Sequence, residues 1–89
     1  MILTLALPQR VTQDEAQATC DGLLALVQTQ PGPIVIDASA LREFDTAALA
    51  VITTCQRAAI ARGVELTVQG LPEQAQTLAR VYGVSQLLG

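Results

Sequence analysis

Hydrophobic and polar positions along the chain follow two different periods. Apolar residues recur at every second position over residues 2–7 and again over residues 64–68, which predicts two strands. Residues 34–36 form a short, continuous β-branched run, which predicts a fully buried strand of a parallel sheet. Three further segments repeat their apolar positions at helical spacing: residues 13–30, 45–62 and 72–83. The expected order is therefore strand, helix, strand, helix, strand, helix.

The ends of these helices carry recognisable signals. Thr12 and Glu15 form a T-x-x-E capping box, and Asp45 is a good N-cap because its carboxylate accepts from the following N–H groups. Pro31 ends the first helix, and Gly63 supplies a left-handed stop for the second. The boundaries of the first two helices are thus well defined.

The order of elements predicts the fold class. Strands separated by helices of this length imply right-handed βαβ crossovers, and so an α/β domain with a mostly parallel (mixed) sheet and helices packed on it. The 89 residues fit a single domain over 1–89. We expect Tyr82 to lie on the apolar face of the third helix, Gly83 to end it, and residues 84–88 to form a short helix or turn.

Composition and charge exclude several classes of protein. A hydrophobic fraction of 51% with only 15% charged residues excludes disorder. The net charge is −3 and the five Lys and Arg residues are scattered, which argues against nucleic-acid binding and against a polybasic membrane patch. No apolar run approaches the ~20 residues of a membrane span, and residues 1–7 lack the basic start of a signal peptide. We therefore expect a cytoplasmic protein without direct membrane insertion.

Catalytic and metal chemistry find little support in the sequence. There is no His, and Cys20 and Cys55 are far apart, so we expect two reduced thiols and no metal site. No Gly-rich phosphate loop or paired-acid motif is present, so we expect neither an enzyme nor a cofactor. Asp37 at a strand end and Asp45 at a helix cap fit structural roles.

The second helix, residues 45–62, carries two apolar faces. The face that we expect to lie on the sheet comprises Leu49, Ile52, Thr53, Gln56, Ala59 and Ile60. The opposite face would be charged on an ordinary surface helix, but its residues are Ala47, Ala50, Val51, Thr54, Ala58 and Ala61. Either neighbouring helices cover this face, or a partner docks on it with Val51 as the central contact. We favour docking, because three helices offer little material to cover both faces.

Thr46 follows the N-cap of this helix, where the backbone N–H groups and the helix dipole favour an anion. A phosphate on the Thr46 hydroxyl would be tolerated there and would repel an acidic or apolar partner. The simpler interpretation, that Thr46 only helps to cap the helix, is favoured by position alone.

Two segments resemble the signature of STAS domains. They are Ile34-Val35-Ile36-Asp37-Ala38-Ser39 and, after a short spacer, Phe44-Asp45-Thr46-Ala47-Ala48-Leu49-Ala50-Val51-Ile52. In that family a buried strand ends in Asp, and a second Asp, followed by Ser or Thr and two small residues, opens the central helix. Residues 63–72 resemble the next strand and turn of the family. The resemblance covers most of residues 12–88 and implies a small STAS-type α/β domain.

Two branches of the family are compatible with these residues. Anti-sigma-factor antagonists are phosphorylated on the Ser or Thr after the Asp, which is Thr46 here, and bind a serine kinase when unmodified. The other branch is the small cytoplasmic STAS subunit of the Mla-type ABC transporter, which maintains outer-membrane lipid asymmetry in Gram-negative bacteria. Residues 66–70 and 77–84 look like this second branch, with its Leu-Ala-basic-x-Tyr segment.

The resemblance implies a non-catalytic protein that docks through its central helix on the ATPase subunit of a phospholipid-transporting ABC complex and regulates or stabilises it. The implied contact residues are Asp45, Thr46, Ala47, Ala50, Val51, Thr54 and Ala58. The partner would hold the domain at the inner membrane. The alternative is an anti-sigma-factor antagonist switched by phosphorylation of Thr46, and a weak homodimer through the same helix face also stays open. We expect Val51→Asp to abolish docking while leaving the fold intact.

Overall fold

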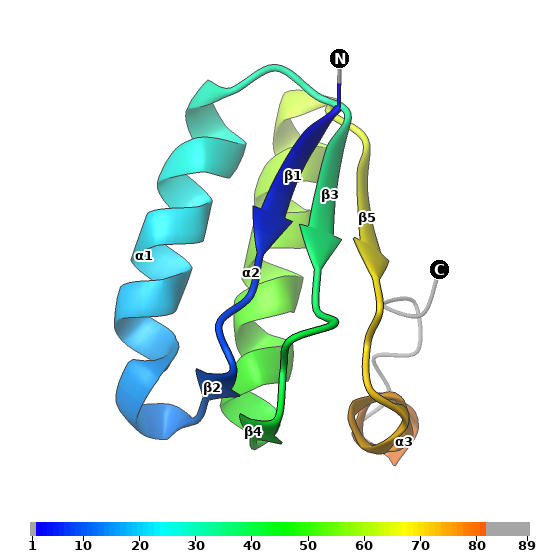
Figure 1. Cartoon of the computed structure of the whole chain (residues 1–89). Helices are drawn as coiled ribbons and strands as arrows, with labels where there is room; N and C mark the ends of the chain where they lie inside the picture. The colour runs from blue at the N-terminus through cyan, green and yellow to red at the C-terminus, as the bar shows by residue number, and fades with distance from the viewer. Residues whose placement is uncertain (1, 82–89) are drawn as a thin grey trace.

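The computed structural model describes residues 2–81, and its centre is a three-stranded parallel sheet (Figure 1). The strands are β1 (Leu3–Ala6), β3 (Ile34–Asp37) and β5 (Leu66–Gln69), in the order β1-β3-β5. Both pairs are parallel, and the register places Ile36 between Leu5 and Val68. The predicted α/β fold with a mostly parallel sheet is confirmed.

The two faces of the sheet differ in burial. Leu5, Ile34 and Ile36 point into the core and are 6%, 0% and 0% exposed, respectively. Val35 and Asp37 point to the opposite face and are half-buried. The sequence-based expectation of a fully buried β3 is therefore wrong for Val35, because the helices that pack on the core side leave the other face of this strand partly open.

Helices α1 (Gln13–Thr29) and α2 (Thr46–Arg62) lie side by side on one side of the sheet and pack along each other (Figure 1). Both begin at the end of the molecule where the parallel strands finish, so they run in the same direction. Gly63 ends α2 with φ 70°, the left-handed conformation predicted for this position.

A second, very short parallel pair extends the fold beyond the main sheet. β2 (Arg10–Val11) pairs with β4 (Glu43–Phe44), just before the first turns of α1 and α2. Sequence reasoning missed this pair, because a two-residue strand leaves no periodic pattern. The pair brings Arg10 beside Glu43, and so places charged side chains next to the start of both helices.

The third helix, α3 (Glu73–Val81), lies near the same end of the molecule as β4 (Figure 1). Ala75 and Ala79 are buried, and Leu78 packs against the core. The expectations for Tyr82, Gly83 and the tail fall outside the described residues. The carboxyl ends of the strands, β2–β4, α3 and the first turns of α1 and α2 therefore gather at one end of the domain.

Candidate partner-binding surface

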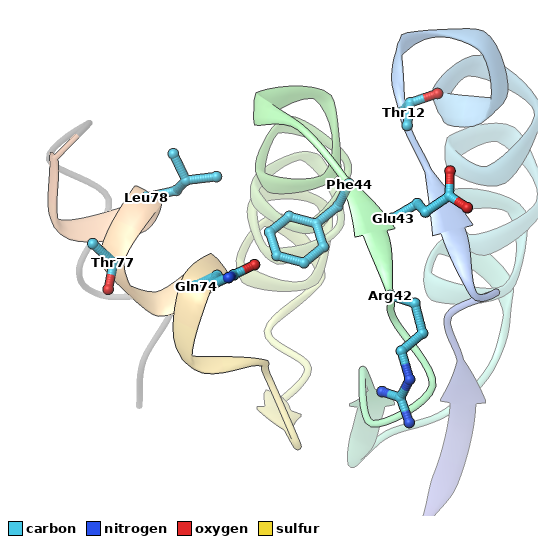
Figure 2. A pocket seen from close by; sticks show the side chains of 7 residues that line it. All are labelled: Thr12, Arg42, Glu43, Phe44, Gln74, Thr77 and Leu78. Carbon is cyan, nitrogen blue, oxygen red and sulfur yellow. The ribbon is translucent and has the colours of Figure 1, made fainter.

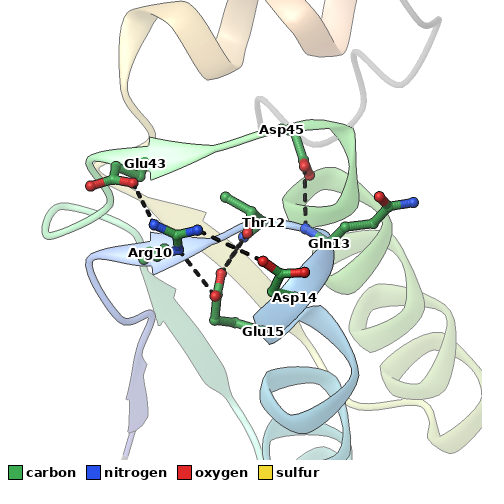
Figure 3. Close-up of polar contacts among 7 residues, drawn as sticks. All are labelled: Arg10, Thr12, Gln13, Asp14, Glu15, Glu43 and Asp45. Atoms are coloured by element: carbon green, nitrogen blue, oxygen red, sulfur yellow. Dashed lines mark hydrogen bonds and ion pairs between the residues drawn. The ribbon is translucent and has the colours of Figure 1, made fainter.

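Asp45 organises the start of the central helix. One oxygen of its carboxylate accepts a hydrogen bond from the Ala47 N–H at 2.8 Å, which caps α2 as predicted. The other oxygen accepts from the Gln13 N–H at 3.2 Å, at the first residue of α1 (Figure 3). A single carboxylate thus satisfies N–H groups of two helices, which are otherwise left without partners at helix N-termini. Asp45 is therefore a structural residue at the entrance of the surface.

An exposed ridge of small residues runs along α2 from its first residue. Thr46, Ala50 and Thr54 lie one helical turn apart and are all exposed, and we call these three residues the α2 ridge. The Thr54 hydroxyl donates to the Ala50 carbonyl at 2.8 Å, so this polar group is satisfied within the helix. The ridge therefore presents methyl groups, backbone and two threonine hydroxyls, of which that of Thr54 already donates within the helix and that of Thr46 lies at the beginning of the helix.

The remaining predicted contact residues lie beside the ridge or beneath it. Ala47 and Ala58 are half-buried, whereas Val51 is only 3% exposed and belongs to the hydrophobic core. The expectation that Val51 is an exposed central contact is therefore wrong. Val51 is buried because α1 packs along this side of α2, so a neighbouring helix covers part of the second apolar face.

The face that α2 turns toward the core also differs from the predicted one. Leu49, Ile52 and Ala59 are buried as expected, but Ile60 is 77% exposed. Cys55, which the prediction did not place on this face, is fully buried. The core side of α2 is rotated toward α1 relative to the expectation, because α2 packs on the sheet and on α1 at the same time.

A small groove separates α1 and α2 next to the ridge. Its volume is about 180 Å³. Its walls are Ala16, Gln17 and Cys20 from α1 and Ala47, Ala50, Val51 and Thr54 from α2. Four of the predicted contact residues therefore line one concave surface, together with three residues of α1 that sequence reasoning missed. Only the packing of α1 beside α2 reveals that these three residues of α1 border a groove.

A charged cluster holds the base of α1 against β4 (Figure 3). Arg10 donates to Glu15 at 3.0 Å and to Glu43 at 2.9 Å, and its guanidinium lies 3.9 Å from Asp14. The bond to Glu15, followed by the charges of Glu15 and Glu43, raises the pKa of Arg10. Hydrogen bonds from the hydroxyl and the N–H of Thr12 lower the pKa of Glu15, in the predicted capping box. Sequence reasoning missed this cluster because it depends on β2 and β4.

A larger pocket of about 630 Å³ lies between β4 and α3 (Figure 2). The Phe44 ring faces Gln74 and Leu78 across it. Its two charged residues are engaged elsewhere, since Arg42 donates to the Ser39 carbonyl at 3.2 Å and Glu43 accepts from Arg10. The pocket is therefore walled by apolar and amide side chains beside the start of α2. Both of its charged side chains are held by other residues and do not point to a ligand.

Comparison with known families identifies the domain. A family model described as "Mlab, STAS domain" matches residues 3–89. The chain belongs to the STAS domain family. A search of curated proteins finds no significant match. Membership confirms the predicted family resemblance, and Asp45-Thr46 stands, as expected for a STAS domain, at the start of its central helix.

STAS domains are generally not enzymes. Membership of the family therefore supports a non-catalytic role for this chain at the level of the family. Asp37 accepts a hydrogen bond from the Ser39 N–H at 2.9 Å, and hydrogen bonding by Ser39 lowers the pKa of Asp37. This carboxylate is therefore part of the turn after β3. Over residues 2–81, no group of three His, Cys, Asp or Glu side chains could hold a metal ion. Within the same residues, no helix has the length and hydrophobicity needed to cross a membrane.

Proposed function

We propose that this STAS domain is a docking subunit that binds, through α2, the ATPase of a phospholipid-transporting ABC complex of the type that maintains outer-membrane lipid asymmetry. The observation that carries the proposal is the α2 ridge, Thr46, Ala50 and Thr54, which is exposed and uncharged at the start of the central helix. An exposed helix face normally carries charged residues. Small side chains there allow a partner to approach the backbone of α2 closely. The description of the matching family model points to the same branch.

The ridge would work together with the residues around it. Asp45 holds the start of α2 in place, and Thr46 offers a hydroxyl at the entrance of the contact. Ala47 and Ala58, both half-buried, border the contact, whereas Val51 supports it from the core. Bound in this way, the domain affects how stable the ATPase is or how it assembles, without contacting ATP. The ATPase in turn holds the domain at the inner membrane.

A pull-down from the native host tests the proposal. The tagged wild type is compared with Ala50→Asp, which puts a charge on the ridge, and with Ile60→Asp, which puts the same charge on an exposed residue near the end of the same helix, outside the second apolar face. We expect an ABC ATPase to be captured by the wild type and by Ile60→Asp, and to be lost with Ala50→Asp, because an unpaired charge is costly to bury in an interface. Capture of no ABC ATPase by the wild type would refute the proposal.

A second candidate function is an anti-sigma-factor antagonist. It is favoured by the exposure of Thr46 directly after the N-cap, where a kinase could reach its hydroxyl. In this case the pull-down would capture a serine kinase, and Thr46→Glu would weaken binding more than Thr46→Ser. Phosphopeptide analysis across growth phases gives a separate answer, since the absence of phosphate on Thr46 in every phase would contradict this candidate.

A further inference from the structure

The groove between α1 and α2 has the dimensions of a receptor for one side chain. Its volume of about 180 Å³ lies below the ~300–1,000 Å³ of typical small-molecule sites. Ala50 and Thr54 of the α2 ridge form one wall, and Gln17 of α1 forms part of the other. The floor includes Val51, which is part of the core. A protein that covers the ridge therefore meets, directly beside it, an apolar depression open to a large aliphatic or aromatic side chain.

The two rims of this groove differ in charge. Along the full length of α1 the sequence contains Asp14, Glu15 and Asp21 but no Lys or Arg, whereas α2 contains no acid. Asp14 and Glu15 face Arg10, which offsets their charge. Asp21 lies one turn beyond Gln17 on the same face of α1 and accepts a hydrogen bond from the Gln17 amide at 3.0 Å. Asp21 therefore lies next to the groove residue Gln17, and it is the carboxylate of α1 that Arg10 does not pair with.

The cations of α2 do not cancel this charge. Arg62 donates to the carbonyls of Val27 and Gln30 at the far end of α1, away from the groove. Arg57 is exposed and lies almost one turn beyond Thr54, past the last groove residue of α2. The α1 rim thus presents a negative charge beside an apolar depression, in a chain whose net charge is −3.

We propose that this α1–α2 groove anchors the partner by receiving one large apolar side chain, and that a Lys or Arg within one helical turn of that side chain pairs with Asp21. This inference rests on the proposed function and adds two points to it: α1 takes part in docking, and the docking segment of the ATPase is basic. Apolar anchors in pockets typically dominate interface energies, and charge complementarity adds orientation and speeds association.

The first test fills the groove from the α1 side. Gln17→Phe places a ring in the depression, and Gln28→Phe places the same ring on an exposed site near the other end of α1. Affinity for the purified ABC ATPase captured in the pull-down is measured by titration calorimetry. We expect Gln17→Phe to weaken binding by about tenfold or more, and Gln28→Phe to change it less than about twofold.

The second test reverses the charge. Asp21→Lys and Glu73→Lys change the net charge equally, but Glu73 lies on α3. We expect only Asp21→Lys to weaken binding strongly, and its effect to shrink as salt is raised.

The third test replaces Gln17 with the photo-crosslinker p-benzoylphenylalanine and identifies the crosslinked peptide, which should contain a large apolar residue close to a Lys or Arg of the ATPase.

The outcomes separate this inference from the proposed function. If the wild type binds the ATPase and Ala50→Asp weakens binding, but the Gln17 and Asp21 variants behave like their controls, docking through α2 stands and the groove inference is overturned. A crosslink to a second copy of this chain, or to an acidic segment of the ATPase, overturns it as well. Failure of the wild type to bind any ABC ATPase overturns both.

Discussion

The carboxylate of Asp45, at the cap of α2, accepts a hydrogen bond from the backbone N–H of Gln13, the first residue of α1, at 3.2 Å. At the opposite end of the same two helices, Arg62 of α2 donates to the Val27 carbonyl and, at 2.8 Å, to the Gln30 carbonyl. An anion thus lies at the N-terminus of α1 and a cation at its C-terminus, which is the favourable arrangement with the helix dipole. Both ends of α1 are fastened to α2, so the groove between them has a defined width.

Replacing Asp45 should loosen this arrangement. We expect Asp45→Ala to lower the free energy of unfolding by about 1–2 kcal/mol, because it removes the cap on Ala47 and the bond to Gln13 together. Asp45→Ser is the matched variant: it can still cap α2, but its shorter side chain loses the bond to Gln13, and we expect a loss of about 0.5–1 kcal/mol. Urea unfolding monitored by circular dichroism measures both, and equal stability of all three proteins would contradict the bridging role of Asp45.

Arg62 should stabilise the domain through hydrogen bonding to α1. We expect Arg62→Met, which keeps a long apolar stem, to lower the free energy of unfolding by about 1 kcal/mol, because the terminal carbonyls of α1 lose a charged donor. Arg57→Met is the control, since Arg57 is exposed on the same helix and should tolerate the change. A loss of the same size in both variants would mean that the general charge of α2 matters and the contact with α1 does not.

Val51 is a residue of the core, and its substitution should affect folding before docking. Val51→Ala should cost about 2 kcal/mol, from two lost methyl groups and the remaining cavity. Val51→Asp buries an unpaired carboxylate at a cost of several kcal/mol, a large part of the ~5–15 kcal/mol that stabilises most domains. The control is Ala50→Asp, at the exposed position immediately before Val51, and this variant should keep the helical circular dichroism spectrum. A Val51→Asp protein as stable as the wild type would show that this part of α2 is open to solvent.

The limits of α2 could be predicted from the sequence, but the burial of Val51 could not. Local signals predicted the limits of α1 and α2, because Thr12, Asp45 and Gly63 act on their immediate neighbours. The helical periodicity of α2 showed apolar residues on two sides of the helix, but the side that is buried is rotated toward α1 relative to the prediction. The periodicity could not tell how much of the second face α1 covers, because that depends on how closely the two helices pack.

The same limit explains the features of the site that were missed. The groove needs Gln17 and Cys20 of α1 beside Ala50 of α2, and these positions share no sequence pattern. Likewise, Arg10 meets Glu43 only because the two-residue strands β2 and β4 pair in parallel. Contacts between elements, together with the two-residue strands β2 and β4, were beyond sequence reasoning.

Acid should destabilise the domain through two carboxylates. Hydrogen bonds from Thr12 lower the folded-state pKa of Glu15, and Ser39 does the same for Asp37. A carboxyl with a lowered folded-state pKa contributes stability above its unfolded value, and this contribution disappears as the pH falls through the folded value. We therefore expect the free energy of unfolding to be level near neutral pH and to fall below about pH 4.5. Glu15→Gln should have lower stability at neutral pH and a shallower acid dependence; an unchanged dependence would exclude a contribution from Glu15.

The two thiols should differ strongly in reactivity. Burial, followed by the charge of Cys20, raises the pKa of Cys55 to about 11, and Cys55 is fully buried, whereas Cys20 is half-buried in the wall of the groove. The thiolate is the reactive form, so a disulfide reagent at about pH 8 should label Cys20 in the folded protein and Cys55 only after unfolding.

The Cys20→Ser variant isolates the buried thiol, whose labelling rate should then follow the opening of the fold and rise with urea. Rapid labelling of Cys55 in folded Cys20→Ser would contradict the packing of α1 on α2. Because Cys20 lines the groove, saturating ABC ATPase should also slow its labelling in the wild type. Unslowed labelling in a complex that is demonstrably formed would mean that the partner leaves the groove open and contacts only the outer side of α2.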